Sequence, residues 1–216
     1  MSVISGIISS PRREGRFEIL VDGNSFATLS LDAIDRLQLR IGRDILGLEE
    51  RIAQESAQLK VFDRALNMLA FRARSSIELS RSLVRKGDDK AVVDLVIARL
   101  KEQGLLDDAV FARAYVRAKV VGAKQSRRRV QGDLGRKGVA RDVAAEAIAD
   151  VFENESVDQR AIVEEAARKK LNTMTRLEPL VRRRRLYAFL ARRGYDTDDI
   201  RRAMEAVGEE LRDVDE

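Results

Sequence analysis

The apolar and polar positions divide the chain into a short strand-like beginning and a long helical remainder. Residues 3–29 hold three short apolar runs (VISGII, RFEILV and SFATL) separated by the turn-like stretches RREG and DGN. The Asp22-Gly23 pair favours a tight hairpin, because glycine tolerates the positive φ angle that such a turn needs. We therefore expect a small N-terminal sheet. Ser30 is a candidate N-cap for a short helix over LDAIDRLQL, which a return strand or a loop follows at residues 40–44.

Beyond residue 47 the apolar positions follow the spacing of an α-helix. The apolar residues near one face of a 3.6-residue period are Leu48, Ile52, Leu59, Phe62, Leu66 and Leu69. This pattern predicts one long helix that ends near Phe71. Short helical segments separated by Gly, Ser, Asp and Asn follow it without a long flexible linker, which predicts a stack of small units.

Three glycines, Gly87, Gly138 and Gly194, align three copies of one helical pattern. Each follows two cations and has apolar residues four and eight positions before it and ten and thirteen positions after it. In chain order these residues are Leu79, Leu83, Arg85, Lys86, Ile97 and Leu100; then Val130, Leu134, Arg136, Lys137, Ile148 and Val151; then Leu186, Leu190, Arg192, Arg193, Met204 and Val207. The pattern is typical of two helices joined by a turn in which the glycine ends the first helix.

A further amphipathic segment precedes each pair of helices, so that each repeat is expected to hold three helices. The three glycines are 51 and 56 residues apart, and a unit of this length buries little core alone, so neighbouring repeats should pack together. The predicted domains are a β-rich module over residues 1–47, a linking helix with the first repeat over 48–104, a second repeat over 105–153, a third over 154–210 and an acidic tail over 211–216.

The composition favours a mostly α fold and narrows the chemistry. Only 5% of the 216 residues are aromatic and two are proline, which favours helix over sheet. The absence of cysteine and histidine excludes disulfides, thiol nucleophiles, the usual zinc ligand sets and imidazole acid–base catalysis. The N-terminal sequence shows no basic flank followed by a long apolar run, so we expect a cytoplasmic protein.

Positive charge is concentrated in the middle of the chain. Residues 1–57 carry a net charge of −2, residues 58–195 carry +13 and residues 196–216 carry −6. Such a field attracts polyanions, most often nucleic acid, and the acidic end is expected to screen the basic surface or to compete for it. A highly charged surface without a specific partner is the plain alternative.

The run from Arg72 to Lys119 resembles the bacterial RecX family, whose members modulate the recombinase RecA. The likeness extends over roughly residues 60–207. Its most distinctive pieces are the helical stretch over residues 76–87 that ends in Arg-Lys-Gly, the RLK motif that follows it, and GLLDD shortly before a Phe-Ala pair. Order, spacing and threefold repetition agree, which makes the match more specific than any single short motif.

The resemblance implies tandem three-helix repeats in an elongated, curved array that lies in the groove of the RecA filament on single-stranded DNA. There the protein is expected to inhibit RecA ATP hydrolysis, strand exchange and coprotease activity, and so to act in homologous recombination, DNA repair and the SOS response. It is then a regulator with no catalytic site and no cofactor, and we expect a monomer. The N-terminal strands resemble an extension found on some family members.

Basic helix faces are the candidate site for RecA and DNA. With about 100° per residue, the outward face of the second repeat carries three arginines, and the third repeat carries their equivalents. The first repeat has Ile77 and Glu78 at two of these positions, so its contact should be weaker. Guanidinium groups suit phosphates and carboxylates because they stay charged and donate in a planar fork. The candidate residues are Arg128, Arg129, Arg136, Lys137, Arg184, Arg185, Arg192, Arg193, Arg85 and Lys86.

The stretch RRRVQGDLGRKG, residues 127–138, has other interpretations. It lacks the GK[ST] ending of a phosphate-binding loop. Gly132 and Gly135 match the GxxG of a KH loop, which would make the chain a nucleic-acid-binding protein that acts without RecA. Because the other repeats hold helix-compatible residues at both positions, we interpret the stretch as a helix. A carboxylate-dependent nuclease is the enzyme alternative, although no acids show metal-ligand spacing.

Several other residues have structural interpretations. Asp107 or Asp108, and the pairs Asp88-Asp89 and Asp198-Asp199, are expected to cap helix starts. Phe111 should enter the core and Pro179 should start a helix. The three tyrosines, Tyr115, Tyr187 and Tyr195, are expected to pack in the core or at its rim, with base stacking as the alternative.

Overall fold

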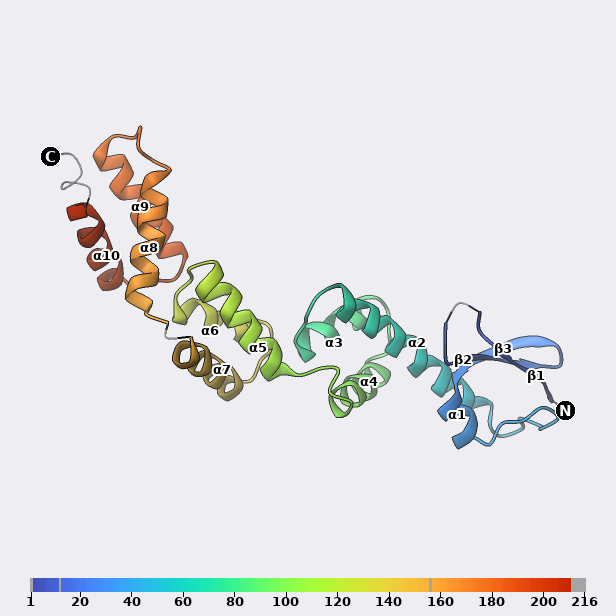
Figure 1. Ribbon diagram of the computed structural model, residues 1–216. Helices are drawn as coiled ribbons and strands as arrows, with labels where there is room; N and C mark the ends of the chain where they lie inside the picture. Colours follow the sequence, from blue (N-terminus) through green and yellow to red (C-terminus); the bar gives the residue numbers. More distant parts are fainter. Residues whose placement is uncertain (1, 12, 156, 211–216) are drawn as a thin grey trace. The chain divides into compact units, whose positions relative to one another are not determined.

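The computed structural model describes residues 2–11, 13–155 and 157–210. In chain order its elements are β1 (Ile4–Ser9), β2 (Arg16–Val21), β3 (Asn24–Ser30), α1 (Leu31–Arg36), α2 (Glu49–Phe71), α3 (Ser76–Arg85), α4 (Lys90–Glu102), α5 (Asp108–Arg117), the π-helical turn η1 (Ala118–Gly122), α6 (Arg127–Arg136), α7 (Arg141–Asn154), α8 (Gln159–Asn172), α9 (Pro179–Arg192) and α10 (Thr197–Glu210) (Figure 1). The predicted class, mostly α with a small N-terminal sheet, is confirmed. The described residues divide into two compact units, one built from residues up to 74 with 79–106 and the other from residues 75–78 with those from 107 onward.

The N-terminal module is an antiparallel sheet with the strand order β1-β2-β3. Asp22 and Gly23 have φ angles of 48° and 82°, which confirms the predicted hairpin turn. The Ser30 hydroxyl accepts a hydrogen bond from the backbone N–H of Ala33 and caps α1, as predicted. Residues 40–44 form a turn with one isolated bridge to the start of the chain, so the loop alternative is correct.

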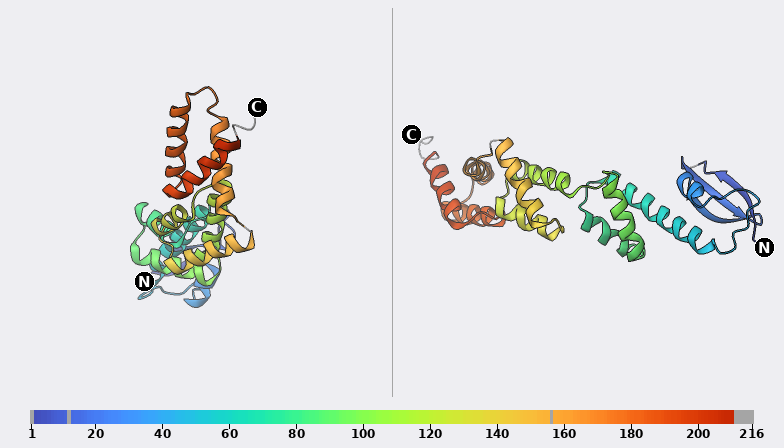
Figure 2. Two further views of the ribbon diagram at one scale, coloured as in Figure 1. Left: turned by 90° about the vertical axis from the view of Figure 1, so that its left-hand side faces the viewer. Right: turned by 90° about the horizontal axis from the view of Figure 1, so that it is seen from below.

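The start of α2 completes the core of this module, and the two lie side by side at the blue end of the chain (Figure 2). Ile52 of α2 is fully buried among Ile19, Leu29 and other apolar residues of the sheet. Asp63, near the middle of α2, holds Arg16 of β2 through an ion pair of 2.6 Å. The long helix predicted up to Phe71 therefore serves both the sheet and the first repeat.

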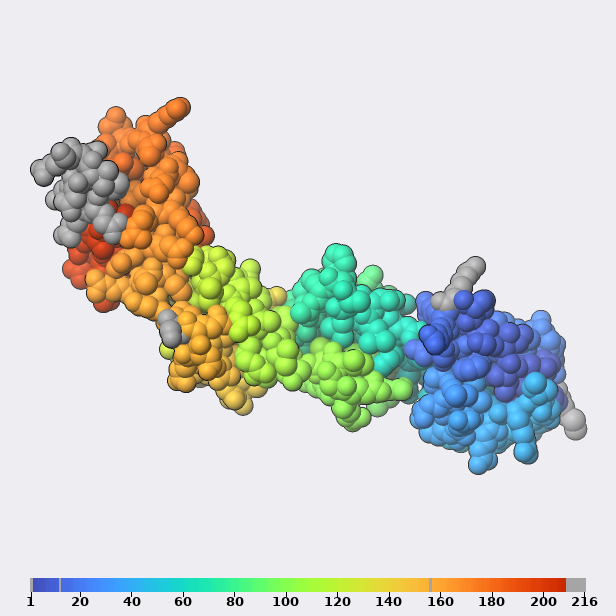
Figure 3. Space-filling model, viewed as in Figure 1, coloured from blue at the N-terminus to red at the C-terminus, as the bar shows by residue number. Residues whose placement is uncertain are grey.

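The apolar residues of the repeats gather in three further clusters. The first lies among α2, α3 and α4, the second among α5, η1, α6 and α7, and the third among α8, α9 and α10. The paired positions before the three glycines, which are Leu79, Leu83, Val130, Leu134, Leu186 and Leu190, are all buried. The tandem three-helix arrangement is thereby confirmed. In the space-filling view the residues of α5 to α7 form one closely packed body (Figure 3).

Helix starts follow the predicted capping with one correction. Asp89 caps α4 and Asp107 caps α5, since each carboxylate accepts from two backbone N–H groups of its helix. Asp108 instead accepts a hydrogen bond from the backbone N–H of Ser76. At the start of α10 the capping prediction for Asp198 and its neighbour is wrong, because the carboxylate that accepts from the backbone is that of Asp196. The helix α10 therefore begins at Thr197, two residues earlier than a cap at Asp198 would place its start.

No helix among the described residues is long and apolar enough to cross a lipid bilayer.

Candidate polyanion-binding helix faces

Residues 127–136 form the helix α6, and this confirms the helical interpretation of the basic stretch. The Ser126 hydroxyl caps it by accepting from the backbone N–H of Arg129 at 3.2 Å. Val130 and Leu134 are fully buried on its inner side. Gly132 and Gly135 lie within the helix, and a Cβ at Gly135 would meet no atom within 4 Å. Close approach of a neighbouring element is therefore not the reason for this glycine.

The cations of α6 differ in whether their side chains contact other residues of the chain. Asp133 holds two of them, since Arg136 donates to its carboxylate and the Arg129 Nε lies 3.5 Å from it. The guanidinium of Arg127 lies over the ring of Phe152, 5.3 Å from its centroid. Arg128 is exposed and its side chain makes no hydrogen bond or ion pair with the described residues. It is the cation of α6 that is most available to a partner.

The helix α9 presents the equivalent cations in the third repeat. Pro179 occupies its first turn, as predicted, and its inner side is buried at both apolar repeat positions. Arg184, Arg185 and Arg192 are exposed, and none pairs with a carboxylate in the described part of the chain. Three guanidinium groups on one helix thus keep their charge uncompensated by near neighbours, which raises the local positive potential.

Lys137 and Arg193, the cations directly before the helix-ending glycines, are half-buried. The Lys137 Nζ lies 2.8 Å from the Glu78 Oε1 and 5.2 Å from the centre of the Tyr115 ring. The Arg193 guanidinium lies over the ring of Phe189 at 4.1 Å. Their charges are therefore engaged inside the molecule, and they offer less to a partner than the exposed arginines do.

Arg85 and Lys86 of the first repeat are exposed and make no ion pair among the described residues. At the two other equivalent positions of this repeat stand Ile77, which is exposed, and Glu78, which is bonded to Lys137. The structure therefore places one outward cation of the expected triplet in the first repeat. Arg85 and Lys86 belong to one compact unit, and Arg184 and its neighbours belong to the other. The two groups of cations are therefore separate surfaces.

The three tyrosines occupy three different environments. Tyr195 is buried and its hydroxyl donates to the carbonyl oxygen of Lys124 at 3.0 Å, and burial raises its pKa. Tyr115 is half-buried against Phe111, and burial together with the nearby Asp133 carboxylate raises its pKa. Tyr187, on α9, is exposed. The predicted core or rim packing applies to the first two, whereas the third has a free ring face.

The second and third repeats are joined by contacts that the sequence pattern did not reveal. The Ser126 hydroxyl donates to the carbonyl oxygen of Gly194 at 2.7 Å. The backbone N–H of Ser126 donates to the carbonyl oxygen of Arg193 at 3.0 Å. The Lys124 ammonium lies 2.7 Å from the Glu165 carboxylate of α8. Hydrogen bonds from Lys124 and Lys169 lower the pKa of Glu165 to about 2. A serine before a helix indicates a cap, but nothing in one sequence indicates its second role in a contact between repeats.

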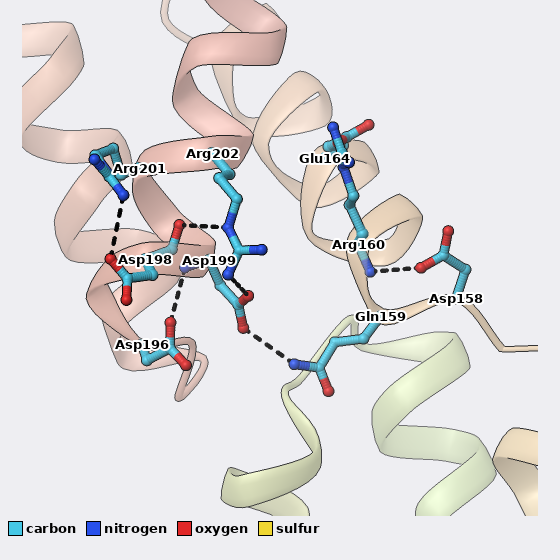
Figure 4. Close-up of polar contacts among 9 residues, drawn as sticks. All are labelled: Asp158, Gln159, Arg160, Glu164, Asp196, Asp198, Asp199, Arg201 and Arg202. Carbon is cyan, nitrogen blue, oxygen red and sulfur yellow. Dashed lines mark hydrogen bonds and ion pairs between the residues drawn. The ribbon is translucent and has the colours of Figure 1, made fainter.

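Polar side chains gather at the starts of α8 and α10, and one hydrogen bond there joins the two helices (Figure 4). The Gln159 amide donates to the Asp199 carboxylate at 3.1 Å, and Arg202 lies 3.3 Å from the same carboxylate. Arg201 pairs in the same way with Asp198 at 3.4 Å. Among the described residues no group of three acidic side chains is placed to hold a metal ion.

The fold and these surfaces define a class of protein: a tandem helical-repeat protein that presents arginine-rich helix faces. Three family models match it in succession, described as the first, second and third three-helix domains of RecX, over residues 62–100, 107–148 and 158–204. Together they cover more than half of the chain. The chain belongs to the RecX family of regulatory proteins.

Relatives named Regulatory protein RecX agree with this assignment. The protein of Amycolatopsis mediterranei (strain U-32) is 35% identical over 159 residues, which are 74% of this chain and 87% of the relative. That of Chlorobaculum tepidum is 32% identical over 157 residues, which are 72% of this chain and 94% of the relative.

Two solved structures share the fold at lower identity. The crystal structure of a regulatory protein RecX is 19% identical and superposes with a TM-score of 0.74 over 95% of this chain and 100% of that one. The crystal structure of RecX from Lactobacillus salivarius, also 19% identical, has a TM-score of 0.56 over 70% of this chain and 97% of that one.

Proposed function

We propose that this regulatory protein binds RecA and its filament on single-stranded DNA, lies in the filament groove, and inhibits RecA ATP hydrolysis, strand exchange and coprotease activity in the cytoplasm. Family membership supports the regulatory role. The observation that carries the choice of surface is the set of exposed guanidinium groups on α6 and α9 that have no partner among the described residues, of which Arg128 and Arg184 stand at equivalent positions. A filament of protein and DNA offers both of the groups that guanidinium binds best, carboxylate and phosphate.

The structure narrows the ten candidate cations to the ones that a partner can reach without breaking an internal contact. Lys137, Arg193, Arg129 and Arg136 are engaged with neighbouring side chains, whereas Arg85, Lys86, Arg128, Arg184, Arg185 and Arg192 are not engaged with any described residue. The proposed binding surface of the second and third repeats therefore centres on Arg128, Arg184, Arg185 and Arg192.

Reversal of these four arginines to Glu should abolish inhibition of the RecA ATPase on single-stranded DNA. Each exchange replaces an attractive charge by a repulsive one, and because all four side chains are exposed the fold should survive. A matched control reverses four exposed cations that lie elsewhere and make no internal pair, namely Arg40, Arg51, Lys60 and Arg141. Full inhibition by the folded quadruple variant would contradict the assignment.

A parallel shift assay on DNA alone separates this function from the alternative, a basic nucleic-acid-binding protein that acts without RecA. Inhibition at protein concentrations well below those that shift bare DNA supports action on the filament. Binding to DNA phosphates would also fall steeply with salt, with a logarithmic slope of about 0.7 for each phosphate neutralised on a single strand. Strong DNA binding without any effect on RecA would favour the alternative.

A further inference from the structure

A groove on the third repeat combines an apolar floor with an arginine rim. It has a volume of about 690 Å³ and lies among α8, α9 and α10. Leu171, Leu186 and Met204 contribute to its floor. The cations along it are Arg182, Arg183, Arg184 and Arg201, against the single carboxylate of Glu205. Of these cations only Arg201 pairs with a carboxylate in the described part of the chain, so the groove is strongly positive.

The groove lies where a repeat makes its contact with the next one. In the second repeat, the residues fourteen and twelve positions before the glycine are Lys124 and Ser126, and both bind the third repeat. In the third repeat the same positions are Leu180 and Arg182, and neither contacts another repeat among the described residues. The start of α9 is therefore the exposed counterpart of a surface that is covered one repeat earlier.

The residues at this open end differ from those of the covered one in a consistent way. Measured back from the glycine that follows each helix, α9 begins one turn earlier than α6, at Pro179. On this extra turn Leu180 is 82% exposed and Val181 is 42% exposed. Two aliphatic side chains thus project beside the groove, where the second repeat has the ion-paired Lys124, and they extend the apolar surface of its floor.

We propose that this groove and the adjoining turn of α9 dock an acidic amphipathic helix of a partner protein. Such a helix would lay its apolar residues against Leu180, Val181 and the apolar floor, and its carboxylates against the guanidinium groups of Arg182 and Arg183. Leu180 and Val181 favour a protein segment over nucleic acid, because they offer neither a charge to a phosphate nor a ring to a base, and Tyr187 is the one aromatic residue among those that line the groove. The two turns of α9 next to Tyr187 supply both the apolar and the charged half of the site.

A second copy of the chain fits the open end poorly. In the covered contact, the second repeat receives the glycine-ended helix of its neighbour, so a second copy would have to offer its own Gly87 end. The serine that donates across the contact between the second and third repeats is replaced by Arg182 at this end, so a second copy could not repeat that hydroxyl hydrogen bond. An acidic partner would instead pair its carboxylates with Arg182.

Anisotropy of a labelled synthetic peptide tests the proposal with the intact protein. The probe is a helix of about four turns with Leu at i, i+3, i+4 and i+7 and Glu on the opposite face. Leu180→Glu and Arg183→Glu should each weaken its binding by about tenfold or more, since hydrophobic anchors and charged partners at an interface dominate affinity. The matched control is Leu95→Glu on α4, where the leucine is 57% exposed and belongs to the other compact unit.

Three outcomes would overturn the proposal. Equal binding of a scrambled peptide of the same composition would reduce the effect to net charge. Binding that appears only after residues 211–216 are removed would assign the groove to the chain's own acidic end. Displacement of the peptide by a thymidine oligonucleotide, with oligonucleotide binding lost in Leu180→Glu, would make the groove a nucleic-acid site. Because the readout needs no RecA and Leu180 and Arg183 lie outside the four reversed arginines, failure here leaves the proposed RecA regulation untouched.

Discussion

Gly87, Gly138 and Gly194 occupy equivalent positions in sequence, but their surroundings differ. All three have φ between 79° and 92°, a conformation that glycine adopts without strain. A Cβ on Gly87 would meet no atom within 4 Å, whereas a Cβ on Gly138 would lie 2.4 Å from the Cβ of Ile77. At Gly194 the corresponding contact is with the Cβ of Arg129 at 2.5 Å. The second and third glycines are thus needed both for their backbone angle and for the close approach of a neighbouring helix.

Alanine at these positions should separate the two requirements. Gly87→Ala is expected to lower the free energy of unfolding by about 1 kcal/mol, the cost of a left-handed backbone for an L-residue. Gly138→Ala and Gly194→Ala should each lose roughly 2–3 kcal/mol more, because overpacking is added to the same strain. Urea unfolding followed by circular dichroism measures the difference. Equal losses at all three positions would show that the neighbouring helices yield freely.

Glu165 should make stability depend on pH in the acidic range. Its pKa is lowered from 4.5 to about 2 by hydrogen bonds from Lys124 and Lys169, so the charged form is favoured in the folded state. Its contribution is complete above pH 4.5 and is lost as the pH falls towards about 2. The contribution is small because the carboxylate is partly open to solvent and salt screens it. The stability difference between the wild type and Glu165→Gln should therefore shrink from pH 5 to pH 2, and a constant difference would contradict this account.

At the scale of the element, α6 and α9 show how one pattern accommodates different residues. Both bury two apolar residues one turn apart and turn their arginines outward. α6 has glycine at the two positions where α9 has Ala188 and Ala191. Because this pattern is periodic and local, sequence reasoning predicted the helices, their inner faces and the outward arginines. The ion pairs of Asp133 with Arg129 and Arg136 were not predicted, because they depend on side-chain rotamers that the spacing of residues does not specify.

Gly135→Ala should stabilise the protein. The position is helical and exposed, the new Cβ would meet no atom within 4 Å, and alanine has a lower conformational entropy cost in a helix than glycine. We expect a gain of about 0.5–1 kcal/mol in the free energy of unfolding, measured by urea denaturation. Ala191→Gly, the reverse exchange at the equivalent place in α9, is the matched control and should cost a similar amount. A loss of stability in Gly135→Ala would show that α6 needs its glycine for a bend.

At the scale of the whole molecule, each three-helix group has its own apolar cluster, yet the clusters are not independent. Ile162 of α8 joins the cluster of the second repeat, and Ile52 of α2 joins that of the sheet. The proposed boundaries at 47/48, 104/105 and 153/154 stay a prediction. They follow the apolar pattern of the sequence, whereas contacts between neighbours cross each of them, as the ion pair of Glu78 with Lys137 does at 104/105.

Limited proteolysis tests these boundaries. We expect the first cuts near Gly104 and Glu155, where the chain leaves one helix for the next and few side chains cover it. The boundary at 47/48 should resist cleavage, because Ile52 and Asp63 bind α2 to the sheet. Mass spectrometry of the first fragments identifies the sites. First cuts inside α6 or between Lys124 and Ser126 would contradict the prediction, since the third repeat covers that link.

The sequence by itself determined the secondary structure, the three repeats and the side of each helix that is buried, because these depend on local periodicity and on where glycine and capping residues stand. Only the tertiary structure decided which cations are free. Lys137 and Arg128 carry the same charge in the same stretch, but one is held by Glu78 and the other meets no described partner. It also showed that the third repeat covers the start of α6, whereas Leu180 and Val181 at the start of α9 are exposed. Such facts depend on contacts between residues far apart in the chain, which spacing along one sequence does not encode.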